Sequence, residues 1–166
     1  WSDGKLSDVN FVNTTRGTGG LAISKYIEHD LVTDYTIPAD KKFTMDVTLT
    51  LNDAVLANRT FKAESTDGSI NSITTDANGK FEVTLGHRYQ LEIFDLPEET
   101  VASVVERDYS GSGFKPTYYG NNAKDQNTVE IDKNAVATVE VVNTYTPAAA
   151  PAAIIVSGTK YVEDVE

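Results

Sequence analysis

Three side chains with reactive groups, those of Lys25, Glu106 and Asn143, occupy the apolar positions of segments in which apolar and polar residues alternate. The apolar residues that share these positions are Leu21 and Ile23 with the lysine, Ala102 and Val104 with the glutamate, and Val139, Val141 and Tyr145 with the asparagine. If each segment is a half-buried strand, an amine, a carboxyl group and a carboxamide all point into the core. A buried charge without a partner costs several kcal/mol, so three such groups in one core are compatible with folding only if they meet.

The same residues also have simpler interpretations. A slip of one residue in strand register would turn any of these side chains to solvent. Lys25 could be an edge-strand lysine that discourages aggregation. Glu106 could instead cap the loop at Asp108, and Glu92 or Glu130 could then serve as the acid, although Glu130 lies in an exposed-looking segment.

The elements that must position these side chains are predicted to be strands. Apolar residues occupy every second position in several segments, at 43–51, 81–85, 91–93 and 139–141, and helical periodicity is almost absent. Turn-forming sequences separate them, at 66–69, 76–79, 86–87 and 120–122. Short strands with frequent turns predict an all-β fold, a Greek-key (Ig-like) β-sandwich.

The strongest hairpin signal is the pair Asn78-Gly79. Both residues tolerate a positive φ, and the alternating segment 80–85 follows at once. We therefore predict a turn at this position, with strands on both sides.

Charge and composition exclude several classes of protein. The 166-residue chain carries 14 Lys and Arg against 25 Asp and Glu, a formal net charge of −11, without the clustered basic face that nucleic-acid binding needs. No apolar stretch approaches the roughly 20 residues of a membrane span. We therefore expect neither nucleic-acid nor membrane partners. The absence of cysteine excludes disulfides, thiol nucleophiles and thiolate metal sites.

We also expect no metal ion and no cofactor. His29 and His87 are isolated and lack the spacing of a metal-binding pair. Asp95, Glu98 and Glu99 could bind calcium, but the EF-hand pattern is absent and a solvated loop is the commoner arrangement.

The ends of the chain differ from its middle. Residues 146–153 contain two prolines and five alanines without alternation, as expected of a linker, and residues 16–20 form a Gly-rich joint. Segment 9–15 resembles 139–145, and 23–26 is echoed by 157–161. A tandem array explains these echoes. We expect residues 1–18 to be the end of a preceding module with its joint, 19–147 a complete module, and 148–166 a linker and the first strand of a following module.

The segments around the three polar residues resemble the intramolecular isopeptide domains of Gram-positive pilins and surface adhesins, most closely streptococcal backbone pilins and the B-type repeats of collagen adhesins. The matching segments are, in order, LAISK at 21–25, DANGKF at 76–81, LPEET at 96–100, VVE at 104–106 and NTYTP at 143–147. Their order and spacing carry the resemblance, which spans nearly the whole middle module. One departure is Ala102, where those domains usually carry an aromatic residue.

The resemblance implies that the first and last strands lie side by side and that Lys25 and Asn143 form an isopeptide bond. A neutral lysine amine would attack the asparagine carbonyl while a protonated Glu106 polarises it and relays protons, and ammonia would leave. Because the reaction happens once per molecule, the protein is not expected to be an enzyme. The implied function is a structural stalk or shaft module of a pilus or adhesin. It would be extracellular, in the cell wall or pilus of a Gram-positive bacterium, with neighbouring modules or subunits of the same fibre as partners.

An alternative function is ligand binding by an adhesin module. Four aromatic residues, Tyr109, Phe114, Tyr118 and Tyr119, gather in the Gly-rich segment 108–122. If exposed, they could stack on a host glycan or a matrix protein, although packing in the core or against the loop is the commoner arrangement for such residues.

Overall fold

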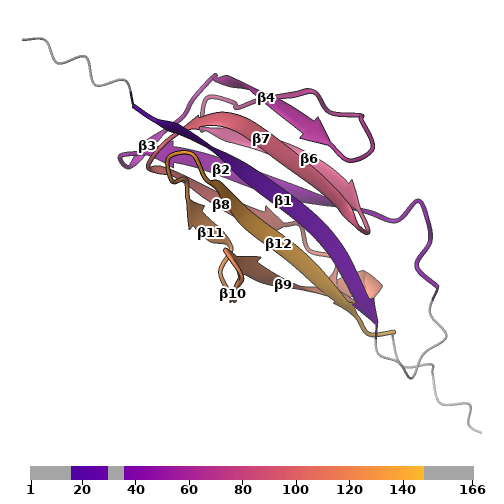
Figure 1. Ribbon diagram of the computed structural model, residues 1–166. Helices are drawn as coiled ribbons and strands as arrows, with labels where there is room; N and C mark the ends of the chain where they lie inside the picture. The colour runs from indigo at the N-terminus through magenta and orange to yellow at the C-terminus, as the bar shows by residue number, and fades with distance from the viewer. Residues whose placement is uncertain (1–15, 30–35, 148–166) are drawn as a thin grey trace, which may run out of the picture.

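The computed structural model describes residues 16–29 and 36–147, and they form two β-sheets packed face to face (Figure 1). The first half of the chain contributes β1 (Thr18–His29), β2 (Lys42–Leu51), β3 (Ala54–Val55), β4 (Thr60–Ser65), β5 (Ser72–Thr74) and β6 (Lys80–Gly86). The second half contributes β7 (Tyr89–Pro97), β8 (Thr100–Glu106), a short 3₁₀ turn η1 (Ser110–Ser112), β9 (Phe114–Gly120), β10 (Ala123–Lys124), β11 (Thr128–Glu130) and β12 (Val136–Tyr145). The predicted all-β sandwich is confirmed. The described ranges contain no helix with the length and apolarity that a membrane crossing requires.

The larger sheet has seven strands in the order β10-β9-β12-β1-β7-β4-β5, and the smaller has five, with β11, β8, β2 and β3 in line and β6 paired to β2. Strand β2 shows why the sequence forms such sheets. Its alternate residues Phe43, Met45, Val47 and Leu49 are fully buried, while the residues between them face outward. The alternation predicted over this segment is therefore confirmed.

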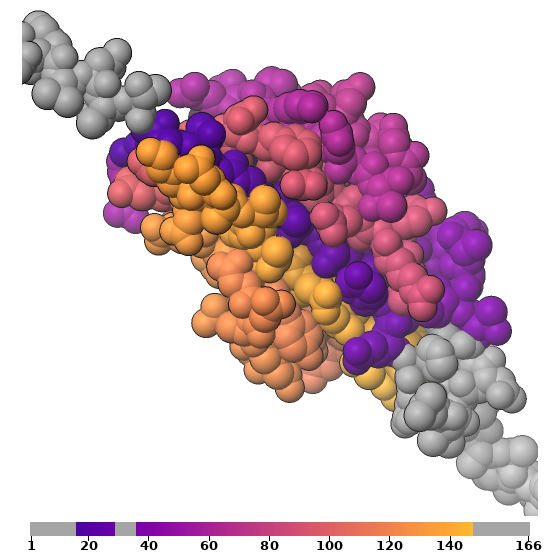
Figure 2. All heavy atoms as spheres, viewed as in Figure 1, coloured from indigo at the N-terminus to yellow at the C-terminus, as the bar shows by residue number. Residues whose placement is uncertain are grey.

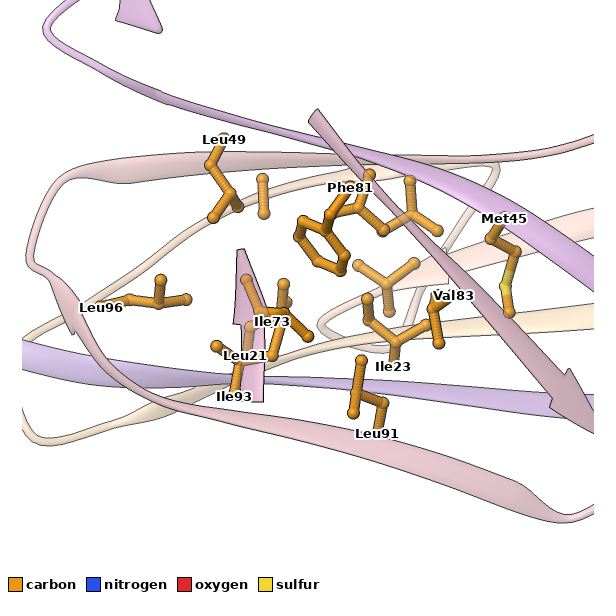
Figure 3. Packing of buried hydrophobic residues seen from close by; sticks show 14 of the residues in the cluster. Leu21, Ile23, Met45, Leu49, Ile73, Phe81, Val83, Leu91, Ile93 and Leu96 are labelled. Atoms are coloured by element: carbon orange, nitrogen blue, oxygen red, sulfur yellow. The ribbon is translucent and has the colours of Figure 1, made fainter. Parts of the chain in front are cut away.

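The core lies between the sheets, where side chains of β1 and β7 meet those of β2 and β6 (Figure 3). Leu21 and Ile23 on β1 and Leu91 and Ile93 on β7 are fully buried. Burial of a side chain of this size contributes roughly 1.5–3 kcal/mol. A second, smaller cluster contains Ile27, Phe43 and Phe114, with Ile37, Tyr109 and Tyr145 packed against it.

The first and last described strands are neighbours in the centre of the larger sheet, as the resemblance implied. β1 and β12 run parallel and pair along ten positions, with Lys25 opposite Val141 and Ile27 opposite Asn143. The start of β1 and the end of β12 consequently lie at opposite ends of the sandwich (Figure 1).

The predicted turn before β6 is present, but the strands that flank it do not form a hairpin. Gly79 has a φ of 71°, and the Asp76 side chain accepts hydrogen bonds from the backbone N–H groups of Asn78 and Lys80 at 2.7 and 2.9 Å. β5 pairs with β4 in the larger sheet, whereas β6 pairs with β2 in the smaller one. The sequence Asn78-Gly79 reverses the chain locally, but the pairing partners are distant in sequence, so the turn connects the two sheets.

Candidate functional site

Three strands from both sheets bring Lys25, Glu106 and Asn143 to one place in the interior. Lys25 lies on β1, Asn143 on the adjacent β12, and Glu106 is the last residue of β8 in the opposite sheet. The lysine and the asparagine are 0% exposed, and the glutamate is 6% exposed. The inward direction expected from the alternation holds for all three residues.

The Glu106 carboxylate bridges the other two side chains. Its Oε2 lies 2.7 Å from Nζ of Lys25, and its Oε1 accepts a 2.7 Å hydrogen bond from Nδ2 of Asn143. Nζ of Lys25 also donates to the backbone carbonyl of Val141 at 3.3 Å. The amine and the carboxamide are therefore held against opposite oxygens of the same carboxylate.

Two oxygens of this group are incompletely satisfied. Asn143 Oδ1 is buried and accepts no hydrogen bond within the described residues. Glu106 Oε2 contacts Nζ of Lys25 as a close ion pair, without the angles of a well-formed hydrogen bond. An unpaired buried acceptor costs roughly 1–3 kcal/mol. The arrangement is thus less stable than its short distances suggest. The carbonyl oxygen of Asn143 is free to accept a hydrogen bond from a new donor, because no donor among residues 16–29 and 36–147 occupies it.

Burial lowers the pKa of Lys25 from 10.5 to about 8, and the charge of Glu106 and its close contact with the amine oppose that shift. The ring of Phe43 lies 4.6 Å from Nζ and covers the amine with apolar surface. Transfer of one proton across the 2.7 Å contact from Nζ to the carboxylate yields a neutral amine and a carboxylic acid without changing the net charge. When the shared proton is on Glu106, the site therefore contains both a nucleophile, the amine of Lys25, and an acid, the carboxyl group of Glu106.

Tyr118 holds the backbone of Glu106 in place. Its hydroxyl accepts a 2.9 Å hydrogen bond from the N–H of Glu106, so the side chain reaches from β9 in one sheet to β8 in the other. Desolvation raises the pKa of this phenol. Sequence reasoning placed Tyr118 only in an aromatic group; its place four residues after Phe114, on the same face of the strand, was a signal that it reaches the interior.

The four aromatic residues of segment 108–122 do not form one exposed surface. Phe114 is 3% exposed and packs in the smaller cluster against Phe43, with ring centroids 5.0 Å apart. Tyr109 packs on the same Phe43 ring, and its hydroxyl accepts from the N–H of Thr44 at 2.9 Å. Tyr119 alone points to the outer face of the larger sheet. Three of the four rings thus pack inward, the arrangement that the sequence analysis named as the commoner one, and binding by this segment stays a prediction.

A pocket of about 510 Å³ does occur beside this segment. It is lined by Asp108, Ser110, Gly113, Phe114, Lys115, Pro116 and Thr146. These residues come from the turn η1 and its flanking residues, the start of β9 and the position just after β12.

The other residues considered from sequence lie away from the buried group. Glu92 lies on the outward side of β7 and Glu130 is exposed on β11, so neither takes the place of Glu106. His87 has a structural contact that its isolated position did not reveal: its Nδ1 accepts a 2.9 Å hydrogen bond from the N–H of Ile27, and burial lowers its pKa.

Glu99 pairs with Arg16 at 3.5 Å near the solvated loop that also carries Asp95 and Glu98. Within the described ranges, no three His, Cys, Asp or Glu side chains are grouped where they could hold a metal ion. The side chain of His29, residues 1–15 of the preceding-module segment expected at 1–18, and the segment expected at 148–166 lie outside the described residues.

Comparisons with known proteins bear on the fold. Residues 19–145 match the family model described as "Domain of unknown function (DUF7601)". No curated protein sequence matches the chain.

Among solved structures, the major pilin from Streptococcus pyogenes is similar with a TM-score of 0.57 at 18% identity over 78% of this chain and 48% of the pilin. A second major pilin, T3.2 from Streptococcus pyogenes serotype GAS13637, gives 0.59 at 15% identity over 78% and 46%. The pilus-presented adhesin Cpa gives 0.57 at 23% identity over 81% and 29%. The chain thus spans about half the length of these pilins, and at such identities the likeness shows a shared fold.

Proposed function

The chain belongs to the DUF7601 family, and on that premise we propose that residues 19–147 form a structural module of a pilus shaft or surface adhesin on a Gram-positive bacterium. In this proposal, an amide bond that the module forms by itself between Lys25 and Asn143 stabilises it, and Glu106 promotes the reaction. One observation carries the proposal: the lysine amine and the asparagine amide contact the same buried carboxylate, each at 2.7 Å. The pilin-like fold supports the cellular setting.

The reaction follows from these contacts. A proton moves from Nζ of Lys25 to the carboxylate of Glu106, and the neutral amine attacks Cγ of Asn143. The bond from Nζ to Cγ forms, the carboxyl proton of Glu106 assists the carbonyl oxygen, and the amine gives up a further proton. The bond from Cγ to Nδ2 then breaks, and Nδ2 leaves with an added proton as ammonia. One proton remains on Glu106, so an ion pair and one carboxamide become an amide, a neutral acid and free ammonia.

The position of the bond suits a module under tension. Force applied to the two ends of the module enters at the start of β1 and leaves at the end of β12, and these parallel strands would slide past one another without a covalent link. A bond between residues 25 and 143 carries the load directly across this pair. Residues 26–142, which include most of the sandwich, then bear none of the pulling force.

Intact mass spectrometry of the purified chain tests the proposal. The wild type should fall short of its calculated mass by one ammonia molecule, and Lys25→Ala, Asn143→Ala and Glu106→Ala should each show the full calculated mass. Lys62→Ala is the matched control, because this lysine is 65% exposed and should leave the deficit unchanged. A proteolytic fragment joining the peptides that contain Lys25 and Asn143 should accompany the deficit. A wild-type protein of full mass would refute the cross-link.

A second candidate function, ligand recognition by an adhesin module, is favoured by the pocket beside segment 108–122. The pocket is large enough for a peptide side chain or a sugar, and its wall includes the charged Lys115 next to the apolar Phe114 and Pro116. In this alternative the cross-link only stiffens the scaffold. Lys115→Ala should then weaken binding to immobilised collagen, fibronectin or glycans without changing the mass deficit. Equal binding by the variant and the wild type would exclude the pocket as that site.

A further inference from the structure

A groove of about 270 Å³ crosses the outer face of the larger sheet, on the side away from the buried lysine. Its floor is a row of four side chains from four adjacent strands. Gln90 on β7 lies opposite Ser24 on β1, Ser24 lies opposite Glu140 on β12, and Glu140 lies opposite Tyr119 on β9. Because alternate residues of a strand share a face, all four side chains point outward from the same line across the sheet. β1 and β12 form the middle of this face and run side by side across the front of the molecule (Figure 2).

Two tyrosines provide the apolar part of the groove. Tyr119 closes the row on β9, and Tyr26 lies two residues beyond Ser24 on the same face of β1. Tyr26 is 37% exposed, and its ring makes an edge contact with His87 at 6.1 Å between centroids, which restricts its orientation. Aromatic rings of this kind offer an apolar face together with a hydroxyl at the edge.

The polar groups of the groove are available to a ligand. Within the described part of the chain, the side chains of Ser24, Gln90 and Glu140 make no hydrogen bond or ion pair to another residue, and Asn122 and Thr138 add an amide and a hydroxyl at the rim. The lining therefore combines hydrogen-bond donors and acceptors on a rigid sheet, beside the two rings. A sugar matches this combination, because its hydroxyls need both donors and acceptors and its C–H face needs apolar surface.

The charge of the groove narrows the class of sugar. No lysine or arginine lines it, and its one charged residue, Glu140, is an acid on a chain of net charge −11. Sialic acid, uronic acids and sulfated or phosphorylated sugars would meet the carboxylate of Glu140, and the lysine nearest in this row, Lys124, lies beyond Tyr119 on β10, outside the lining. We propose that the outer face of β7, β1, β12 and β9 binds a neutral saccharide unit, with Gln90 and Glu140 bonding to its hydroxyls and the tyrosine rings contacting its apolar face. This site is separate from the buried cross-link and from the pocket beside segment 108–122.

A glycan array that carries neutral and sialylated glycans tests the inference, with the intact chain displayed as a fluorescent multimer. Binding to at least one neutral glycan is expected, without binding to its sialylated counterpart where the acid occupies the same terminal position. Tyr119→Ala and Glu140→Ala should each weaken binding about tenfold, the effect of one lost contact or hydrogen bond. Glu82→Ala is the matched control, because Glu82 is an exposed strand acid on the outer face of the smaller sheet; it should bind as the wild type does.

Nuclear magnetic resonance titration with the glycan that binds should locate the site. Saturable shifts are expected for the backbone amides around residues 24, 90, 119 and 140. Absence of binding to every neutral glycan overturns the inference, and so does binding that Lys115→Ala abolishes while Tyr119→Ala and Glu140→Ala leave it unchanged. Because neither groove variant touches the buried group, the mass deficit reports on the cross-link independently of this result.

Discussion

Replacing Glu106 by glutamine should separate the fold of the module from its cross-link. Glutamine has nearly the same size and keeps a carbonyl oxygen that can accept the hydrogen bond from Nδ2 of Asn143. It can neither take up the proton of Lys25 nor deliver a proton to the carbonyl of Asn143, so the attack is not promoted. We expect Glu106→Gln to fold with the full calculated mass and without an amide between residues 25 and 143.

The lost stability can be worked out from the length of the closed loop. The segment from Lys25 to Asn143 contains 119 residues, and the loop-closure relation for covalent cross-links gives roughly 5 kcal/mol for a loop of this length. The described module should unfold with an entropy of about 0.27 kcal/mol per kelvin, by the usual value per residue. The melting temperature of Glu106→Gln should therefore lie about 20 °C below that of the wild type.

Thermal unfolding followed by circular dichroism, with intact mass measured on the same samples, provides the assay. Glu92→Gln is the matched control, because Glu92 is a strand glutamate on the outward side of β7; it should keep both the deficit and the melting temperature. If Glu106→Gln keeps the mass deficit, the carboxyl group is not needed for the reaction. If it has the full mass but melts within about 5 °C of the wild type, loop closure does not explain the stability of the module.

Three further measurements test the site. A chain refolded from inclusion bodies should cross-link more slowly as the pH rises through about 8, because the pair of Lys25 and Glu106 then loses its one shared proton. The rate is measured by quenching samples at intervals and determining their mass. A rate that increases through pH 8 would mean that a neutral amine alone is sufficient. Tyr118→Phe removes the acceptor for the N–H of Glu106 and should slow cross-linking at every pH, whereas Tyr119→Phe on the outer face should not; equal rates for the two variants would remove Tyr118 from the site. In single-molecule pulling by the two ends, Lys25→Ala should release roughly 400 Å more chain than the wild type, because residues 26–142 become extensible, and equal extensions would mean that no bond bypasses them.

Local patterns in the sequence predicted the strands and the direction of the reactive side chains. The alternation along β2 is a property of neighbouring residues, and the structure buries its apolar positions from Phe43 to Leu49. The same reasoning pointed Lys25 and Asn143 inward. Because a side chain's face depends only on strand parity, these expectations did not require knowledge of which strands pair.

Pairing and hydrogen bonds between distant segments could not be predicted in this way. The turn at Asn78-Gly79 is local and was found, but the separate sheets of β5 and β6 depend on partners far along the chain. The hydrogen bond from the Glu106 N–H to the Tyr118 hydroxyl joins two sheets, and no spacing rule relates the two residues. The outer row from Gln90 to Tyr119 likewise arises only once the register of four strands is fixed.

The proposed reaction would reverse the effect of the buried group on stability. In the unreacted module, the lowered pKa of Lys25 means that the folded state binds the lysine proton more weakly than the unfolded state does. This opposes folding by about 3 kcal/mol below pH 8, and the penalty disappears as the pH rises from about 8 toward 10.5. An amide at Lys25 would have no charge to bury, so the proposed reaction would remove the penalty and add the loop constraint. In this proposal, the free-energy cost of burying the amine, the acid and the carboxamide together is temporary, because their reaction relieves it.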